Sequence, residues 1–91
     1  MPDNPKIIVL SEQLRGQSFE LTQDKYTIGR HEDCDICVPD PTVSNHHCTL
    51  AREDDGYVLH DEGSTNGTRV NGVRTQESQK LVNSDIIQVG A

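Results

Sequence analysis

Short runs of alternating hydrophobic and polar residues recur along the whole chain. In one of them, Cys48 and Leu50 alternate with Thr49 and Ala51, as expected for a strand with one buried face. Clusters of Gly, Pro, Asn, Asp or Ser separate the runs about every eight to twelve residues, and no segment shows the period of a helix. The pattern predicts an all-β domain.

We expect ten short strands, at residues 6–10, 18–21, 25–29, 35–38, 47–52, 57–61, 68–70, 73–75, 80–82 and 85–89. The clearest hairpin lies at residues 70–73, where Asn71-Gly72 suits the positive φ angles of a type I′ turn. Strands and turns in this rhythm are typical of a sandwich or a barrel.

The length of 91 residues allows one hydrophobic core, because a chain of this size buries only roughly 60–65% of its unfolded surface. We therefore expect a single domain over residues 1–91, with residues 1–5 as a flexible N-terminus. Aromatic residues make up only 3% of the chain, so small aliphatic side chains must form most of the core.

The net charge of −7 opposes sequence-independent binding to nucleic acid or to an anionic membrane. No stretch approaches the ~18 consecutive apolar residues of a membrane helix, and the first residues lack the features of a signal peptide. The spacings of Cys34, Cys37 and Cys48 do not suggest a disulfide framework, which is typical of a reducing compartment. We expect a cytoplasmic protein that binds neither nucleic acid nor membranes.

Two segments, residues 40–47 and 61–68, are rich in hydroxyl, amide and glycine residues. A phosphate monoester carries about −1.5 to −2 charge and three acceptor oxygens, so its site needs a guanidinium group and neutral donors. Arg30, Ser44 and Thr65 supply that set. On spacing alone, a solvated arginine and an ordinary turn remain alternatives to a phosphate site.

The chain also resembles a known family. The motifs that carry the resemblance are Gly29-Arg30, Ser44-x-x-His47, and residues 61–68 with Asn71-Gly72 behind them. Their order and intervals resemble those of the forkhead-associated (FHA) domain, from about residue 6 to residue 90. The resemblance implies an FHA-like β-sandwich of about ten to eleven short, mostly antiparallel strands, with loops at one end that bind phosphothreonine peptides.

The resemblance implies a role for each matching residue. The residues expected to bind the phosphate are Arg30, Ser44 and Thr65. Those expected to contact the peptide are Asn45, Asn66 and Thr42. Those expected to support the site are Gly29, His47 and Gly67. The implied function is a non-catalytic module that recruits proteins phosphorylated by Ser/Thr kinases, with a phosphothreonine-containing protein or peptide as its partner.

Some positions depart from the family pattern. Asn45 stands where many relatives have arginine, so phosphate binding depends more heavily on Arg30. Glu62 stands where an apolar residue is usual and brings a carboxylate next to the binding loop. Thr42 carries no charge, so we expect no strong preference for an acidic residue at the third position after the phosphothreonine.

The chain stops just after Gly90, where relatives continue into a last strand that pairs near the N-terminal strand. With this final strand missing, we expect either that the domain is cut from a longer chain or that the sheet edge is left open. An open edge would lower stability or invite dimer formation by strand exchange. We otherwise expect a monomer, or part of a larger chain.

A metal site is one alternative use of these residues. Cys34-x-x-Cys37, followed by His46, His47 and Cys48, contains enough soft ligands for zinc. Alternation along a strand puts Cys34 and Cys37 on opposite faces, however, so structural cysteines are the better interpretation. We expect no metal and no cofactor.

A hydrolase is another alternative, because Ser44, His47 and Asp61 are the residue types of a catalytic triad. Ser44 lacks the Gly-x-Ser-x-Gly context, and so small a domain offers little room for a substrate cleft. We expect no enzyme activity. A phosphate-independent scaffold of the same fold, binding unmodified protein, remains the alternative among binding functions.

Overall fold

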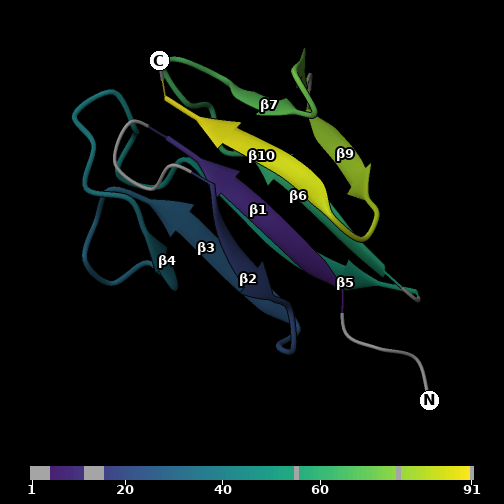
Figure 1. Cartoon of the computed structure of the whole chain (residues 1–91). Coiled ribbons are helices and arrows are strands. Elements are labelled where there is room, and N and C mark those ends of the chain that lie inside the picture. Colours follow the sequence, from purple (N-terminus) through teal and green to yellow (C-terminus); the bar gives the residue numbers. More distant parts are fainter. Residues whose placement is uncertain (1–4, 12–15, 55, 76, 91) are drawn as a thin grey trace.

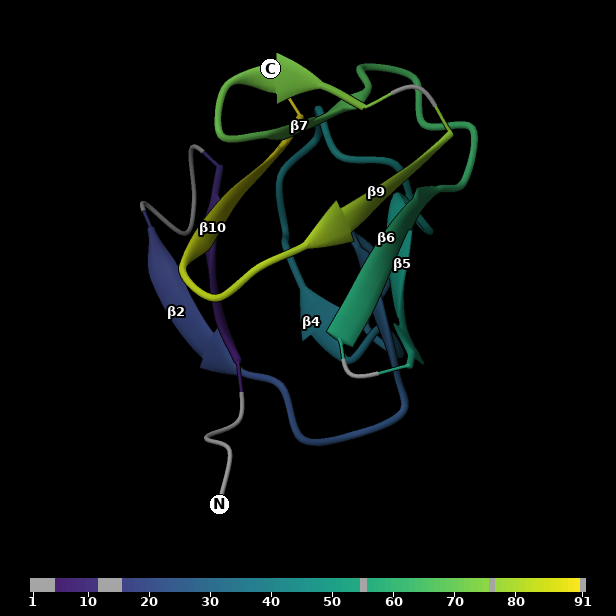
Figure 2. The ribbon, with the colours of Figure 1, turned by 90° about the vertical axis from the view of Figure 1, so that its right-hand side faces the viewer.

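The computed structural model describes residues 5–11, 16–54, 56–75 and 77–90. These residues form two five-stranded β-sheets, which Figures 1 and 2 show as two facing layers. The described ranges contain strands and no helix, so the all-β prediction is confirmed. Accordingly, none of the described residues belongs to a helix that is long and apolar enough to cross a membrane.

One sheet has the strand order β2-β1-β10-β7-β8. Its strands are β1 (Lys6–Leu10), β2 (Gln17–Glu20), β7 (Thr68–Val70), β8 (Val73–Arg74) and β10 (Asp85–Val89). β1 and β10 run parallel, with Ile7 opposite Asp85. The other neighbours in this sheet are antiparallel.

The second sheet has the order β4-β3-β5-β6-β9. Its strands are β3 (Lys25–Gly29), β4 (Ile36–Cys37), β5 (Cys48–Glu53), β6 (Gly56–Asp61) and β9 (Ser78–Leu81). β3 and β4 are parallel, and all other pairs are antiparallel. The prediction of a mostly antiparallel sandwich is therefore confirmed.

Each of the ten expected strands has a counterpart among the described residues, with ends that agree to within two residues. The hairpin at residues 70–73 is also confirmed, because β7 and β8 are antiparallel and φ is 53° at Asn71 and 85° at Gly72. The predicted flexible N-terminus lies outside the described residues except for Pro5, whose carbonyl oxygen accepts a hydrogen bond from the amide of Leu21 at 2.8 Å.

The expectation of an open sheet edge beside the last strand is wrong for the described residues. β10 has a strand on each side, β1 and β7. The N-terminal strand pairs with β10 directly, from Ile7–Asp85 to Leu10–Gln88, and so satisfies the backbone groups on that side of β10. The edges of this sheet are β2 and β8 instead.

Small aliphatic side chains fill the space between the sheets. Alternate residues of β1 and β10 turn inward, and Ile7, Val9 and Ile87 have no exposed surface. From the second sheet, Leu50 and Leu59 face one another across β5 and β6 and are equally buried. Each such side chain contributes about 1.5–3 kcal/mol of hydrophobic stabilisation, so this core holds both sheets, and the loops at their ends, in fixed positions.

Candidate functional site

Three loops leave the second sheet at the same end. The register of β3, β5 and β6 places Ile28 opposite Cys48, and Cys48 opposite Asp61. The segments next to these residues are loop 1 (residues 30–35), loop 2 (residues 38–47) and loop 3 (residues 62–67). Every site residue predicted from the sequence lies in these loops or at a strand end beside them.

Loop 1 and loop 2 are joined through their backbones. The amide of Arg30 donates to the carbonyl oxygen of Ser44 at 3.0 Å, and that of His31 donates to Asn45 at 3.2 Å. Gly29 makes this approach possible, because a Cβ atom there would lie 2.1 Å from the carbonyl oxygen of Asn45. A side chain at position 29 would therefore push loop 2 away from loop 1.

His47 connects loop 2 to loop 3. Its side chain is fully buried. Nδ1 accepts a hydrogen bond from the backbone amide of Ser44 at 3.1 Å, and Nε2 lies 2.8 Å from the carbonyl oxygen of Gly67. These partners assign the neutral ring with its proton on Nε2, so one imidazole fixes the backbone on both sides of the candidate site.

Side chains of loops 2 and 3 also form hydrogen bonds with the backbone of the other loop. Ser44 Oγ accepts a hydrogen bond from the backbone amide of Thr65 at 3.1 Å. The side-chain amide of Asn66 donates to the carbonyl oxygen of Thr42 at 2.6 Å. Thr65 and Asn66 are exposed, while Ser44 and Thr42 are partly buried. The structure thus brings four of the predicted residues together at one surface.

Asp61 holds loop 3 in shape, a role that we did not assign from the sequence. Oδ1 accepts hydrogen bonds from the hydroxyls of Ser64 at 2.6 Å and Thr68 at 2.8 Å, and Oδ2 accepts one from the Ser64 amide at 3.1 Å. Burial acts to raise the pKa of Asp61, but these hydrogen bonds from Ser64 and Thr68 outweigh it and lower the pKa below 3.8. Asp61 is therefore ionised and stabilises the conformation of loop 3 through these hydrogen bonds.

Gly67 and Arg74 form a second close approach. Gly67 is buried with φ of +80°, and a Cβ atom there would lie 2.8 Å from Nε of Arg74 and 3.0 Å from Cζ. The guanidinium group of Arg74 thus lies against the backbone of loop 3. The residues around Arg74 give no local indication that β8 returns to this loop.

Arg30 and Asn45 are both exposed beside Ser44. The four ion pairs found in the described part of the chain do not include Arg30. The carboxylate of Glu62, expected next to the binding loop, accepts a hydrogen bond from the Thr49 hydroxyl on β5 at 2.9 Å. That contact links the carboxylate of Glu62 to β5.

The geometry does not form a catalytic triad. His47 uses one ring nitrogen for the Ser44 amide and the other for the Gly67 carbonyl. The Ser44 hydroxyl is instead paired with Thr65, and Asp61 with Ser64 and Thr68. No ring nitrogen of His47 is left to take a proton from the Ser44 hydroxyl.

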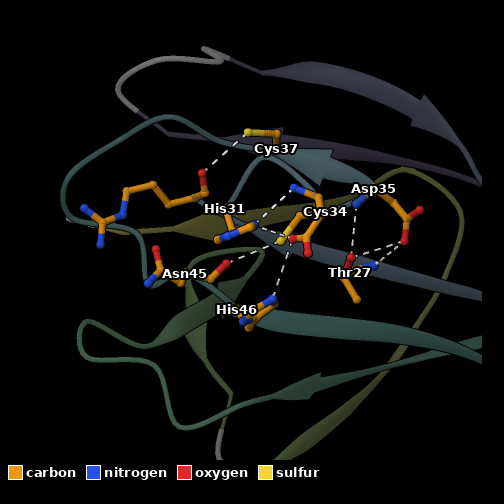
Figure 3. A network of polar contacts seen from close by, with 9 residues as sticks. Thr27, His31, Cys34, Asp35, Cys37, Asn45 and His46 are labelled. Carbon is orange, nitrogen blue, oxygen red and sulfur yellow. Dashed lines mark hydrogen bonds and ion pairs between the residues drawn. The ribbon is translucent and has the colours of Figure 1, made fainter.

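The cysteines do not form the ligand set that the sequence suggested. Cys48 is buried in the core. The Cys34 thiol is also buried, which raises its pKa, and donates to the carbonyl oxygen of Asn45 at 3.3 Å. Cys37 is exposed and donates to the carbonyl oxygen of Arg30 at 3.6 Å. Figure 3 shows the two thiols with separate partners. Cys34 lies in loop 1, outside β4, so the predicted alternation along one strand does not describe this pair.

Comparison with known sequences finds the family that the motifs resemble. The family model of the FHA domain matches residues 26–90. The oxoglutarate dehydrogenase inhibitor of Corynebacterium jeikeium is 38% identical over 91 residues, covering 99% of this chain and 62% of that protein. The glycogen accumulation regulator GarA of Mycobacterium tuberculosis is 36% identical over 89 residues, covering 98% of this chain and 54% of that protein. The chain thus spans about half to three-fifths of the length of these relatives.

Solved structures show a similar fold. The FhaA FHA domain, complexed with the intracellular domain of Rv3910, has a TM-score of 0.73 and 32% identity, covering 82% of this chain and 81% of that chain. A domain from a structural and functional analysis of phosphothreonine-dependent FHA domain interactions has a TM-score of 0.75 and 28% identity, covering 93% and 84%. The sequence matches and the backbone geometry therefore both point to similarity with FHA domains.

Proposed function

Because this chain belongs to the FHA domain family, we propose that it binds proteins and peptides that carry a phosphothreonine and catalyses no reaction. The observation that carries the proposal is the hydrogen bond from the Thr65 amide to Ser44 Oγ. It holds two hydroxyl residues of separate loops together, beside the exposed Arg30. The study of phosphothreonine-dependent FHA domain interactions adds support from a similar fold.

The phosphate group binds to Arg30, Ser44 and Thr65. The Ser44 hydroxyl already accepts a hydrogen bond from Thr65, so its own proton is left to donate to a phosphate oxygen. The guanidinium group of Arg30 supplies the positive charge, and its planar array of donors suits two phosphate oxygens at once. The backbone bonds of loops 1 and 2 fix the Ser44 and Arg30 backbones beforehand, which reduces the entropy lost on binding.

The peptide backbone binds to Asn66, with Asn45 next to the phosphate. One amide proton of Asn66 is used on the Thr42 carbonyl oxygen, which leaves its other proton and its oxygen for an extended peptide. Thr42 directs both its hydroxyl and its amide to Oδ1 of Asp40, at 2.7 and 2.8 Å. This arrangement and the lack of charge on Thr42 agree with weak selection at the third position after the phosphothreonine.

Threonine is preferred over serine through one methyl group. Burial of that carbon contributes about 0.8 kcal/mol, which corresponds to roughly fourfold in affinity. A larger preference requires a close shape fit around the methyl group, beside Thr65 and Asn66.

The biological role is the recruitment of a phosphorylated partner after a Ser/Thr kinase has acted. The names of the relatives, an inhibitor and a regulator, support a regulatory role. The three free cysteines of the structure fit a reducing compartment, so the proposed location is the cytoplasm.

Calorimetry with paired peptides tests the proposal. The peptides come from an oriented phosphothreonine library, and each is compared with its unphosphorylated and phosphoserine forms. The expected result is binding of the phosphothreonine form, weaker binding of the phosphoserine form and none of the unmodified peptide. Equal binding of modified and unmodified peptides would favour the phosphate-independent scaffold instead.

A further inference from the structure

Loops 1 and 2 bring three metal-binding side chains together. The ligand atoms of Asp33, Cys34 and His46 all lie within 4.8 Å of one another. Asp33 and Cys34 belong to loop 1 and His46 to loop 2. Figure 3 shows Cys34 close to the rings of His31 and His46, which stack on one another.

We propose that Asp33, Cys34 and His46 bind a divalent transition-metal ion, with Zn²⁺ as the best match. Thiolate, imidazole and carboxylate are the ligand types that zinc takes in proteins. A thiolate and an imidazole also disfavour Mg²⁺ and Ca²⁺, which prefer oxygen ligands. This ligand set differs from the one that the sequence suggested, because it excludes Cys37, His47 and Cys48 and includes Asp33.

The distances suit a tetrahedral site after a small adjustment. Zinc bonds of about 2.0–2.3 Å place neighbouring ligand atoms about 3.3–3.8 Å apart. His46 Nε2 is already 3.9 Å from Asp33 Oδ1, and these side chains are 61% and 70% exposed. Both can therefore rotate toward the buried Cys34, while a water molecule takes the fourth position.

His31 positions the carboxylate ligand. Its Nδ1 is hydrogen-bonded to Oδ1 of Asp33, and its ring stacks on that of His46 with centroids 5.7 Å apart and an interplanar angle of 18°. Hydrogen bonds of this kind orient metal ligands in characterised sites. Two of the three ligands are thus held by one neighbouring side chain.

Metal binding releases the thiol proton of Cys34. The thiol now donates to the carbonyl oxygen of Asn45. When the metal–sulfur bond forms, the S–H bond breaks and its proton passes to solvent. The Asn45 oxygen keeps its hydrogen bond from the His31 amide, so it retains a partner.

The bound ion would join two loops that the backbone already connects. Loop 1 carries Arg30, and loop 2 carries Ser44 and Asn45. A metal bridge between Cys34 and His46 therefore fixes the distance between these segments, whatever ligand they bind.

Titration of the reduced protein with Co²⁺ alone tests the site, because Co²⁺ reports its ligands by absorption. The expected result is a single ion per chain, a thiolate-to-cobalt charge-transfer band, and displacement by Zn²⁺. Cys34→Ser should lose the band. His46→Asn and Asp33→Asn, which alter exposed side chains, should each weaken Co²⁺ binding by at least about tenfold.

Two control variants test whether Co²⁺ binding depends on the proposed ligands rather than on any cysteine or histidine. Cys37→Ser removes the exposed thiol, and His60→Asn removes a histidine of β6 whose ring contacts Glu53 at the end of β5. Both should bind Co²⁺ like the original protein. The proposal is overturned if the charge-transfer band is absent, if it depends on Cys37, or if His46→Asn and Asp33→Asn bind with unchanged affinity. These two variants decide the matter even if Cys34→Ser does not fold.

Discussion

The backbone of Gly29 lies so close to the carbonyl oxygen of Asn45 that a Cβ atom at position 29 would be 2.1 Å from it. Gly29→Ala should therefore displace loop 2 and destabilise the domain by about 1–3 kcal/mol or more. Urea unfolding followed by circular dichroism measures this change. Phosphopeptide affinity should fall as well, because Ser44 moves with the loop.

Gly56→Ala is the matched control for Gly29→Ala. Among the described residues, a Cβ atom there would meet only the carbonyl oxygen of Leu81, at 4.0 Å, which is an ordinary contact. Its effect should stay within about 0.5 kcal/mol. Similar stability losses in both variants would show that the close approach to Asn45 is not the cause.

Arg30→Ala should weaken phosphothreonine-peptide binding by at least about tenfold, since a hydrogen bond to a charged group contributes about 1.5–3 kcal/mol. The fold should remain intact because the side chain of Arg30 is exposed. Isothermal calorimetry gives the affinity and thermal unfolding checks the fold. Arg69→Ala, which removes an exposed arginine of β7, should keep the original affinity; a variant of Arg30 that also keeps it contradicts the site.

Ser44→Ala should cost about 1.5–3 kcal/mol of phosphopeptide binding. It also removes the acceptor of the Thr65 amide, so we expect a stability loss of about 1 kcal/mol. Ser64→Ala is the comparison, because that hydroxyl binds Asp61 and should affect stability more than affinity. Calorimetry and urea unfolding of both variants separate the roles, and equal affinity losses would argue against direct phosphate contact by Ser44.

Asp61→Asn should lower stability at neutral pH, because the ionised carboxylate accepts three hydrogen bonds. The pKa of Asp61 is lower in the folded protein than its ordinary value of 3.8. Its contribution is therefore present above pH 3.8 and is lost as the pH falls through the folded-state pKa.

Urea unfolding over a range of pH measures this contribution. The stability gap between Asp61→Asn and the original protein should be full at neutral pH and shrink below about pH 4. Asp24→Asn, at a carboxyl side chain that is 92% exposed, should show little difference at any pH. A gap that stays constant down to pH 3 or so would mean that ionisation of Asp61 contributes nothing.

The sequence predicted the strands well because their signal is local. Alternation in β5 and the Asn71-Gly72 turn are visible within a few residues, and both are confirmed. The order of the strands is not local. The pairing of β1 with β10 joins residues from the two ends of the sequence, and the expectation of an open edge failed at this point.

The candidate site shows the same division. The motif residues Arg30, Ser44 and Thr65 were identified from the family pattern, and the loops bring them to one end of the sheet. The hydrogen bonds of Asp61 span only three and seven residues. The packing of Arg74 on Gly67 and the approach of Cys34 to His46 instead join separate segments. A single sequence carries no direct signal for such contacts.

The parallel pairing of β1 with β10 affects how the chain folds during synthesis. A ribosome releases β1 early, yet one side of this strand gains its partner only after Asp85–Val89 has emerged. Until then, the backbone groups on that side of β1 are open to water, chaperones or other nascent chains. Contacts between such distant segments also slow folding, so this domain should complete its sheet after translation of β10.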